Sequence, residues 1–154
     1  GFDERFDRLF EASAPTSGIV GVRDARYLNW RYRDNPLYES HVLMSEQGGR
    51  LQGYLVFTES GGMLNVKDVF PPGNSSSVRD LIAEAIRLGY RRRVASISFT
   101  ALEGNPVLPL FEEFGFRLRQ DGSQMFAYAP AASPIREMIT RAESWYLTVG
   151  DRDV

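Results

Sequence analysis

The sequence predicts an α/β fold in which a mixed, mostly antiparallel sheet contains one central parallel strand pair and carries helices on both faces. Three segments of alternating apolar residues, separated by glycine-rich turns, indicate an antiparallel meander. An amphipathic helix follows the third strand and leads into a further apolar strand. That strand–helix–strand order is typical of a crossover, which makes its two strands parallel.

Composition limits the classes of protein to consider. The chain has 154 residues, of which 43% are hydrophobic and 25% charged, as expected for one globular domain spanning 1–154. A net charge of −2 does not favour nucleic acid or an acidic membrane surface, so we expect neither as a partner. Cysteine is absent, which excludes disulfides, thiolate nucleophiles and cysteine-type zinc sites, and we expect no metal.

Two features of the sequence bear on the location of the protein and on whether the chain is a fragment. We find neither an apolar run long enough to span a bilayer nor a signal-peptide pattern, and we therefore expect a cytoplasmic protein. The chain begins with Gly1 rather than methionine and continues at once into a helical pattern. We expect it to be a fragment of a longer chain.

Two helices are predicted before the sheet. Phe2, Phe6, Leu9 and Phe10 recur at helical spacing, and this first helix should end before Pro15. A second helix should begin after the N-cap Asp24 and run through Tyr32, until Asn35-Pro36 stops it.

The meander comes next. Residues 38–45 and 51–58 should form a hairpin across Gly48-Gly49, and Gly61-Gly62 should turn the chain into a third strand, Met63–Phe70. After the breaker Pro71-Pro72-Gly73-Asn74, we expect Ser77 to cap a helix over 78–88 that Gly89 closes in a left-handed conformation.

The start of that helix is the strongest candidate for a binding site. Free backbone N–H groups and the helix dipole favour an anion there, phosphate above all. Ser75, Ser76 and Ser77 either cradle a phosphate or simply cap the helix, and the residues themselves leave both alternatives open.

The second half of the chain begins with a buried strand over 94–100. A helix should start at Asn105-Pro106 and end at Gly115. Asp121-Gly122 should join strands 116–120 and 125–128 in a second hairpin, and a last helix should run from Ser133-Pro134 to about Ala142.

This order of elements resembles the GNAT (Gcn5-related) N-acetyltransferase superfamily over nearly the whole chain. The most specific local piece is residues 110–116, Leu-Phe-Glu-Glu-Phe-Gly-Phe, which looks like the helix-to-strand segment of that family. The pieces 23–32 and 145–153 also resemble a bacterial subgroup with two such domains in tandem, of which this chain would be the C-terminal one.

The resemblance implies acetyl-CoA as co-substrate and a small amine of unknown identity as acceptor. The pantetheine arm would pair with the backbone of the third strand, at Lys67, Val69 and Phe70. The pyrophosphate would lie on the following loop, formed by Gly73, Asn74, Ser75, Ser76, Ser77 and Val78. Catalysis would consist of positioning the partners and removing a proton from the amine.

The sequence departs from the family pattern at several of these positions. The family loop has small residues, usually glycine, at two positions in its second half. Ser76 and Val78 stand at these positions here, so neither glycine is kept. Phe111 replaces the tyrosine that often protonates the CoA thiolate, and Asn105 lies one place after the usual asparagine. Together these changes favour a weakened or lost acetyl-CoA site.

Two carboxylates are candidates for the general base. Asp68 either accepts the amine proton or, as we favour, is a strand aspartate paired with Lys67 or an arginine, and Glu103 presents the same two alternatives. The single histidine, His41, is expected on a strand face rather than in a catalytic set. Tyr27, Trp30, Tyr32 and Tyr38 either line an acceptor pocket or pack in the core and at its rim.

Two functional hypotheses follow. In the first, the chain is an acyl-CoA-dependent N-acetyltransferase with a degenerate CoA loop. In the second, it is a non-catalytic domain of the same fold that supports an active partner domain in the same chain. The resemblance also implies a V-shaped gap between the two parallel strands, in which acetyl-CoA would lie. Occupation of that gap by the protein's own side chains would favour the second hypothesis.

Overall fold

The computed structural model describes residues 1–13, 18–73, 75–119 and 125–152. Its centre is a four-stranded sheet in the order β2-β3-β4-β5, formed by Ser40–Gln47, Arg50–Ser60, Met63–Phe70 and Ser96–Phe99. The first three strands are antiparallel neighbours, and β5 runs parallel to β4. The predicted mixed, mostly antiparallel sheet is therefore confirmed.

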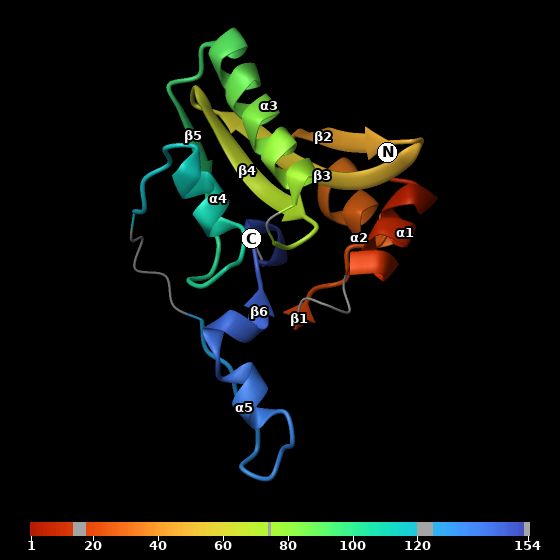
Figure 1. Cartoon of the computed structure of the whole chain (residues 1–154), viewed down its shortest axis with the longest axis vertical. Helices are drawn as coiled ribbons and strands as arrows, with labels where there is room; N and C mark the ends of the chain where they lie inside the picture. The colour runs from red at the N-terminus through yellow and green to blue at the C-terminus, as the bar shows by residue number, and fades with distance from the viewer. Residues whose placement is uncertain (14–17, 74, 120–124, 153–154) are drawn as a thin grey trace.

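Helices cover both faces of the sheet, as predicted (Figure 1). On one face, α1 (Glu4–Ser13) places Phe6 against Tyr54 of β3, with ring centroids 5.4 Å apart. On the other face, α3 (Ser76–Arg92) packs so closely that a Cβ added at Gly53 would lie 3.3 Å from Leu81. Alternate residues of β3 thus face opposite helix layers.

The ends of α3 differ from the prediction. Ser75 is the N-cap: its hydroxyl accepts a hydrogen bond from the Val78 amide at 3.2 Å, whereas Ser77 donates to the Gln52 carbonyl of β3. The C-cap is Arg93 with φ of 55°, because Gly89 lies inside the helix, where an added Cβ would meet Ile97. Gly89 allows close packing rather than a turn.

The second helix begins as predicted. Asp24 accepts a hydrogen bond from the Tyr27 amide at 2.7 Å and caps α2 (Ala25–Leu28). The helix then widens into a π-helical stretch, η2, over Asn29–Arg33, and Asp34 ends it. The sequence showed no sign of this widening.

The C-terminal part departs furthest from expectation. The helix α4 covers Leu108–Glu113 rather than starting at Asn105, because the Asn105 side chain first accepts from the Val107 amide and forms a separate turn. Gly115 has φ of 89° and ends this region as predicted. No strand forms over the described residues 116–119 and 125–128, and Asp121-Gly122 lies outside the described residues.

The last helix is also shorter than predicted, since α5 covers only Arg136–Ile139, with Ile135 at its N-cap. A short turn, η3 (Ala142–Ser144), leads into β6 (Trp145–Tyr146), which pairs in parallel with β1 (Ile19–Val20). Another turn, η4 (Val149–Asp151), follows. This final stretch brings the end of the chain back under the centre of the sheet (Figure 1).

Candidate functional site at the diverging strands

The two parallel strands separate where β4 carries a bulge. Val56 faces Asp68 and Phe57 faces Val66, so Lys67 is an extra residue in β4. Pairing between β4 and β5 ends at the adjacent position, where Val66 faces Phe99. A bulge increases local twist and bends a strand, which accounts for the divergence. The gap predicted between these strands therefore exists.

The C-terminal segment of the same chain fills this gap. Thr148 forms a β-bridge with Ala101, just beyond β5, and the Leu147 carbonyl accepts from the Leu102 amide and from Asn105 Nδ2. On the other side of the gap, the buried Tyr146 hydroxyl donates to the Val69 carbonyl of β4. We call residues 146–151 the C-terminal insert.

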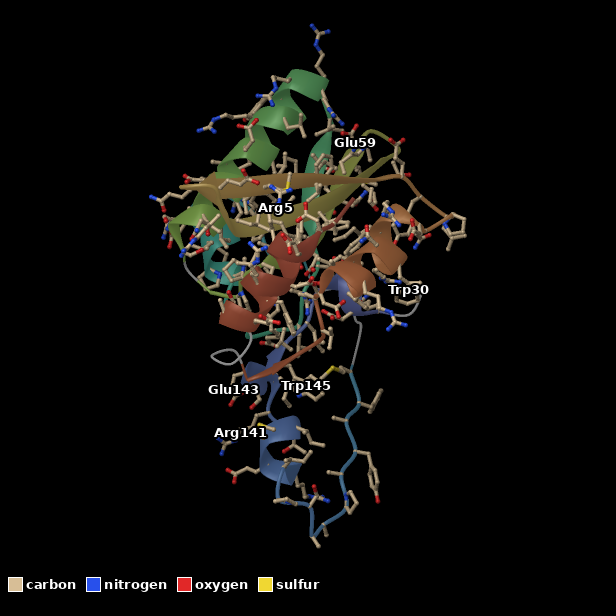
Figure 2. The ribbon with its side chains drawn as sticks, turned by 90° about the vertical axis from the view of Figure 1, so that its right-hand side faces the viewer. Arg5, Trp30, Glu59, Arg141, Glu143 and Trp145 are labelled. Carbon is tan, nitrogen blue, oxygen red and sulfur yellow. The ribbon has the colours of Figure 1, made fainter. Side chains whose placement is uncertain are left out.

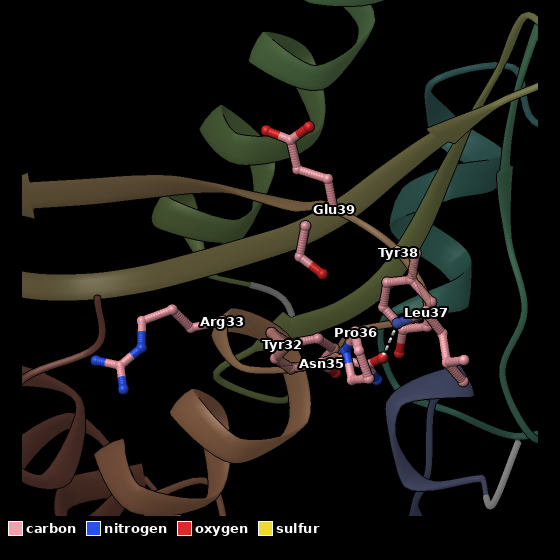
Figure 3. Close-up of a pocket in the computed structure, with 8 residues that line it drawn as sticks. Tyr32, Arg33, Asn35, Pro36, Leu37, Tyr38 and Glu39 are labelled. Carbon is pink, nitrogen blue, oxygen red and sulfur yellow. Dashed lines mark hydrogen bonds between the residues drawn. The ribbon is translucent and has the colours of Figure 1, made fainter.

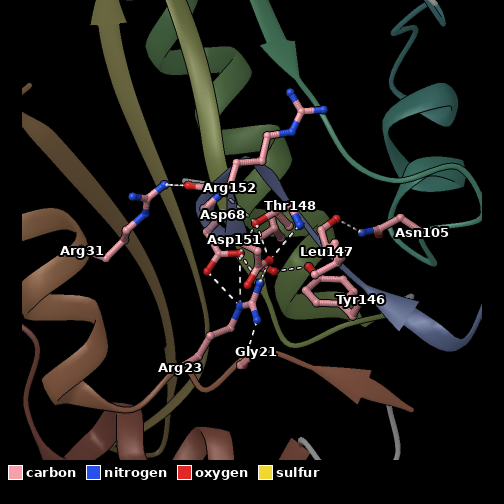
Figure 4. Close-up of polar contacts among 12 residues, drawn as sticks. Gly21, Arg23, Arg31, Asp68, Asn105, Tyr146, Leu147, Thr148, Asp151 and Arg152 are labelled. Atoms are coloured by element: carbon pink, nitrogen blue, oxygen red, sulfur yellow. Dashed lines mark hydrogen bonds and ion pairs between the residues drawn. The ribbon is translucent and has the colours of Figure 1, made fainter. Parts of the chain in front are cut away.

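A buried charge network fixes the C-terminal insert (Figure 4). Arg23 donates to Asp68 from Nε at 3.0 Å and from Nη2 at 3.2 Å, and to Asp151 at 2.6 Å. Asp68 also accepts from the Tyr54 hydroxyl at 3.0 Å and from Thr148 Oγ1 at 2.9 Å. Arg23 and Asp68 are each only 1% exposed. Sequestered in this way, the Asp68 carboxylate has no open path to a substrate amine.

Burial and charge act against each other at this network. Burial raises the pKa of Asp68 above its usual value, outweighing the hydrogen bonds and positive charge of Arg23. For Arg23, burial is the largest single effect and acts to lower the pKa, but the charges of Asp68 and Asp151 and the nearby Tyr54 together outweigh it and hold that pKa well above the ordinary value. Burial likewise raises the pKa of Tyr54 and of Tyr146 well above 10.

The network joins the two sequence pieces that suggested a tandem subgroup. Besides the Arg23–Asp151 ion pair, the Tyr27 hydroxyl donates to the Gly150 carbonyl at 3.0 Å, and Arg31 donates to the Arg152 carbonyl. Sequence analysis favoured Lys67 or an arginine as the partner of Asp68, and the partner is an arginine, but the sequence did not single out Arg23. It gave Thr148 and Asp151 no role. Their signal is faint, because they stand 125 or more residues from Arg23 in the chain.

The expected phosphate loop is described except for Asn74. Gly73 has φ of 101° and its missing Cβ would face open space, while Ser76 is exposed. Ser75 and Ser77 bond to each other at 2.9 Å, and the Val78 side chain is fully buried in the core. Helix capping therefore accounts for Ser75 alone, and the ligand role of this loop remains a prediction.

The remaining candidates lie apart from one another. Phe111 stacks on Phe99, with ring centroids 4.4 Å apart, and its edge meets Phe116. Asn105 is buried and holds the C-terminal insert, while Glu103 is exposed in a turn. Lys67 lies over the Tyr38 ring at 5.4 Å, and burial lowers its pKa. The structure thus gives contacts within the protein to Phe111, Asn105 and Lys67, and the catalytic or ligand roles of all four residues are untested.

A shallow depression of about 360 Å³ lies between η2 and β2 (Figure 3). Tyr32 and Tyr38, two of the aromatic residues predicted for an acceptor pocket, line it together with Arg33, Asn35, Pro36, Leu37, Glu39 and Ser40. Tyr27 and Trp30 instead pack on each other at 5.7 Å. Two of the four aromatic residues predicted for an acceptor pocket therefore line the depression, and two do not.

Comparison with known proteins gives the class of the fold. No protein-family profile matches the chain, and no curated protein sequence does. Among solved structures, it is similar to an aminoglycoside acetyltransferase from an uncultured soil metagenomic sample, determined in complex with trehalose. The TM-score is 0.52 at 14% identity, covering 82% of this chain and 86% of that one. A protein described as a probable acetyltransferase gives 0.49 at 14% identity, covering 83% and 89%.

The chain therefore has an acetyltransferase-like fold. That fold class implies acetyl-CoA as the usual co-substrate, so the fit of the site to this group can be tested. The pantetheine arm would need the backbone of Lys67–Phe70 beside the gap, but Tyr146 already binds the Val69 carbonyl there, and Gly150 lies against the Lys67 carbonyl. With the C-terminal insert in place, the residues present do not fit acetyl-CoA.

No group of three or more histidine, cysteine, aspartate or glutamate side chains in the described ranges could hold a metal ion. Within the same ranges, no helix is both long and apolar enough to cross a membrane.

Proposed function

We propose that this chain is a non-catalytic domain of acetyltransferase-like fold, which supports an active partner domain rather than transferring acetyl groups itself. The observation that carries this proposal is the C-terminal insert. It occupies the gap between β4 and β5 and buries Asp68, the better placed of the two candidate bases. The resemblance of residues 23–32 and 145–153 to a tandem subgroup supports a second acetyltransferase-like domain as the partner.

A second candidate function is kept because the bulge at Lys67 and the divergence of β4 from β5 are intact. In this alternative, the chain is an acyl-CoA-dependent N-acetyltransferase whose C-terminal insert withdraws when the co-substrate binds. The acceptor would be an amine, and its approach would require Asp68 to lose its contact with Thr148.

Calorimetric titration separates the two candidates. Acetyl-CoA or CoA at millimolar concentration should give no binding heat with the wild-type chain. Tyr146→Ala removes both the aromatic ring and the bond to Val69, and it should still not bind, because Asp68 and Arg23 keep the rest of the C-terminal insert in place. Tyr90→Ala, at a tyrosine that is 82% exposed, is the matched control.

Each result has a definite meaning. Saturable binding to the wild type would overturn the non-catalytic proposal. Binding that appears only in Tyr146→Ala, and not in Tyr90→Ala, would favour the second candidate, in which the co-substrate displaces the C-terminal insert.

A further inference from the structure

Among the described residues, the two most exposed large apolar side chains, Phe126 and Tyr128, lie on a projection near the C-terminal end. Residues 125–141, which we call the arm, extend away from the sheet and its helices in both views (Figures 1 and 2). The arm is held by Arg136, which donates to the Ala129 carbonyl at 2.7 Å, and at its base by Trp145, which donates to the Ile139 carbonyl at 3.0 Å.

Large apolar side chains of the arm are turned to solvent. Phe126 is 89% and Tyr128 86% exposed, and Met125, Ile135 and Met138 are between 41% and 50% exposed. Such a concentration within 17 residues is unusual for a surface that stays in water, and contiguous exposed apolar patches commonly mark interaction sites. Aromatic residues and methionine are also the types enriched at protein interfaces.

The sheet offers a matching surface at β5. This strand is the last in the order β2-β3-β4-β5, and no strand in the described ranges pairs with its outer edge. Open edges of this kind readily accept an added strand. Beside the edge, the half-buried Ile97 and Phe99 adjoin the apolar cluster of Phe111 and Phe116.

The occupant of this edge can be inferred from the chain itself. Residues 125–128 have a strand-like sequence, yet in this structure they lie in the arm, away from β5, and form no backbone hydrogen bond to it. A second copy supplies both a free arm and a free edge. A two-fold exchange uses each arm once and closes without leaving either surface open.

The size of such an interface is sufficient. Burying the large apolar side chains of two arms removes on the order of 1,000 Å² from solvent before the surface that they cover is counted. When the surface that they cover is added, the total buried area reaches the range of specific protein–protein interfaces, about 1,200–2,000 Å².

We propose that the chain forms a two-fold dimer in which residues 125–128 of each copy pair with the outer edge of β5 in the other copy. Phe126 and Tyr128 are the apolar anchors. This self-association does not depend on the function proposed above, because neither surface belongs to the gap between β4 and β5.

Sedimentation equilibrium of the whole chain at micromolar to millimolar concentration tests the proposal. The wild type should have twice the monomer mass at the upper concentrations. Phe126→Asp/Tyr128→Asp should shift the dissociation constant at least 100-fold and leave the thermal midpoint of the monomer unchanged. Leu37→Asp, at a side chain that is 72% exposed on another part of the surface, should still dimerise. A wild type that is monomeric throughout would overturn the proposal.

Cross-linking locates the contact, since the chain has no cysteine of its own. Ser96→Cys on β5 and Ala127→Cys on the arm are made as separate variants, both at exposed positions. Mixing them with a bifunctional maleimide should yield covalent heterodimers, and adding Phe126→Asp/Tyr128→Asp to both should abolish the product. A third variant carries both Ser96→Cys and Ala127→Cys in one chain. Efficient cross-linking within its monomers, without dimers, would show that the arm folds back on its own sheet and would contradict the exchange.

Discussion

Arg23 binds two carboxylates and the Gly21 carbonyl while almost wholly buried. Removing an ion pair from water is costly, and the attraction between its charges offsets that cost only when every donor and acceptor is satisfied. Here the guanidinium meets Asp68 through two nitrogens, and the remaining capacity of that carboxylate is taken by Tyr54 and Thr148. The arrangement therefore depends on all its members together.

The first prediction follows from that dependence. Arg23→Met should lower the free energy of unfolding by about 3–5 kcal/mol, because it leaves the buried Asp68 charge unpaired. Adding Asp68→Asn to this variant should recover part of the loss, since the amide carries no charge and can still accept from Thr148. Urea unfolding of the four chains of this cycle gives the coupling.

An exposed ion pair provides the control for that cycle. Arg33→Met breaks the pair with Asp34, where both side chains are about half exposed, and should produce no measurable change. Strictly additive effects of Arg23→Met and Asp68→Asn would show that the two residues do not act as a pair.

At the scale of elements, η4 is seated directly against the π-helical stretch η2. The buried Tyr32 hydroxyl of η2 has no hydrogen-bond partner among the described residues, and a Cβ added at Gly150 would collide with it. Glycine is needed here for close approach rather than for a special backbone angle. The same contact leaves a polar atom unsatisfied in the interior, which is unfavourable.

The second prediction uses this contact. Gly150→Ala should destabilise the chain by about 1–3 kcal/mol through overpacking. Tyr32→Phe alone should be neutral or slightly stabilising, because it removes an unpaired buried hydroxyl. Combining the two should relieve most of the alanine's cost, as measured by thermal and urea unfolding.

Tyr54→Phe serves as the contrast, since that hydroxyl does bind Asp68 and its loss should destabilise the chain by about 1–3 kcal/mol. Equal losses for Tyr32→Phe and Tyr54→Phe would mean that the Tyr32 hydroxyl has a partner in solution.

At the scale of the whole molecule, three buried tyrosines set the alkaline limit of stability. Burial raises the pKa of Tyr32, Tyr54 and Tyr146 well above 10 in the folded chain. In the unfolded chain they ionise near pH 10. Because the raised folded pKa keeps their protons on, their contribution to stability is complete below pH 10 and is lost as the pH rises above it.

The third prediction is a steep loss of stability in base. Each of the three tyrosines should remove about 1.4 kcal/mol from the free energy of unfolding per pH unit above 10. Tyrosinate absorbance from Tyr32, Tyr54 and Tyr146 should therefore appear only together with the loss of circular dichroism. Reversible ionisation of these three tyrosines near pH 10, with the fold intact, would contradict this burial.

Sequence patterns were sufficient for the framework. The third strand was predicted at the bounds that the structure gives β4, Met63–Phe70, because apolar alternation matches a strand buried between two helix layers. The Asp24 cap and the left-handed Gly115 followed from local chemistry in the same way. Both ends of α3 were predicted wrongly. The Ser75 hydroxyl, rather than that of Ser77, accepts from the Val78 amide, and Gly89 packs against Ile97 inside a helix that continues to Arg92.

By itself, the sequence determined the α/β class, the parallel strand pair and the order of the central elements. These features depend on residues close to one another in the chain, whose spacing fixes which face is apolar. Only the tertiary structure decided what fills the gap between the strands. The contact of Arg23 with Asp68 and Asp151 spans up to 128 residues, and no local pattern specifies which distant groups will satisfy a buried charge.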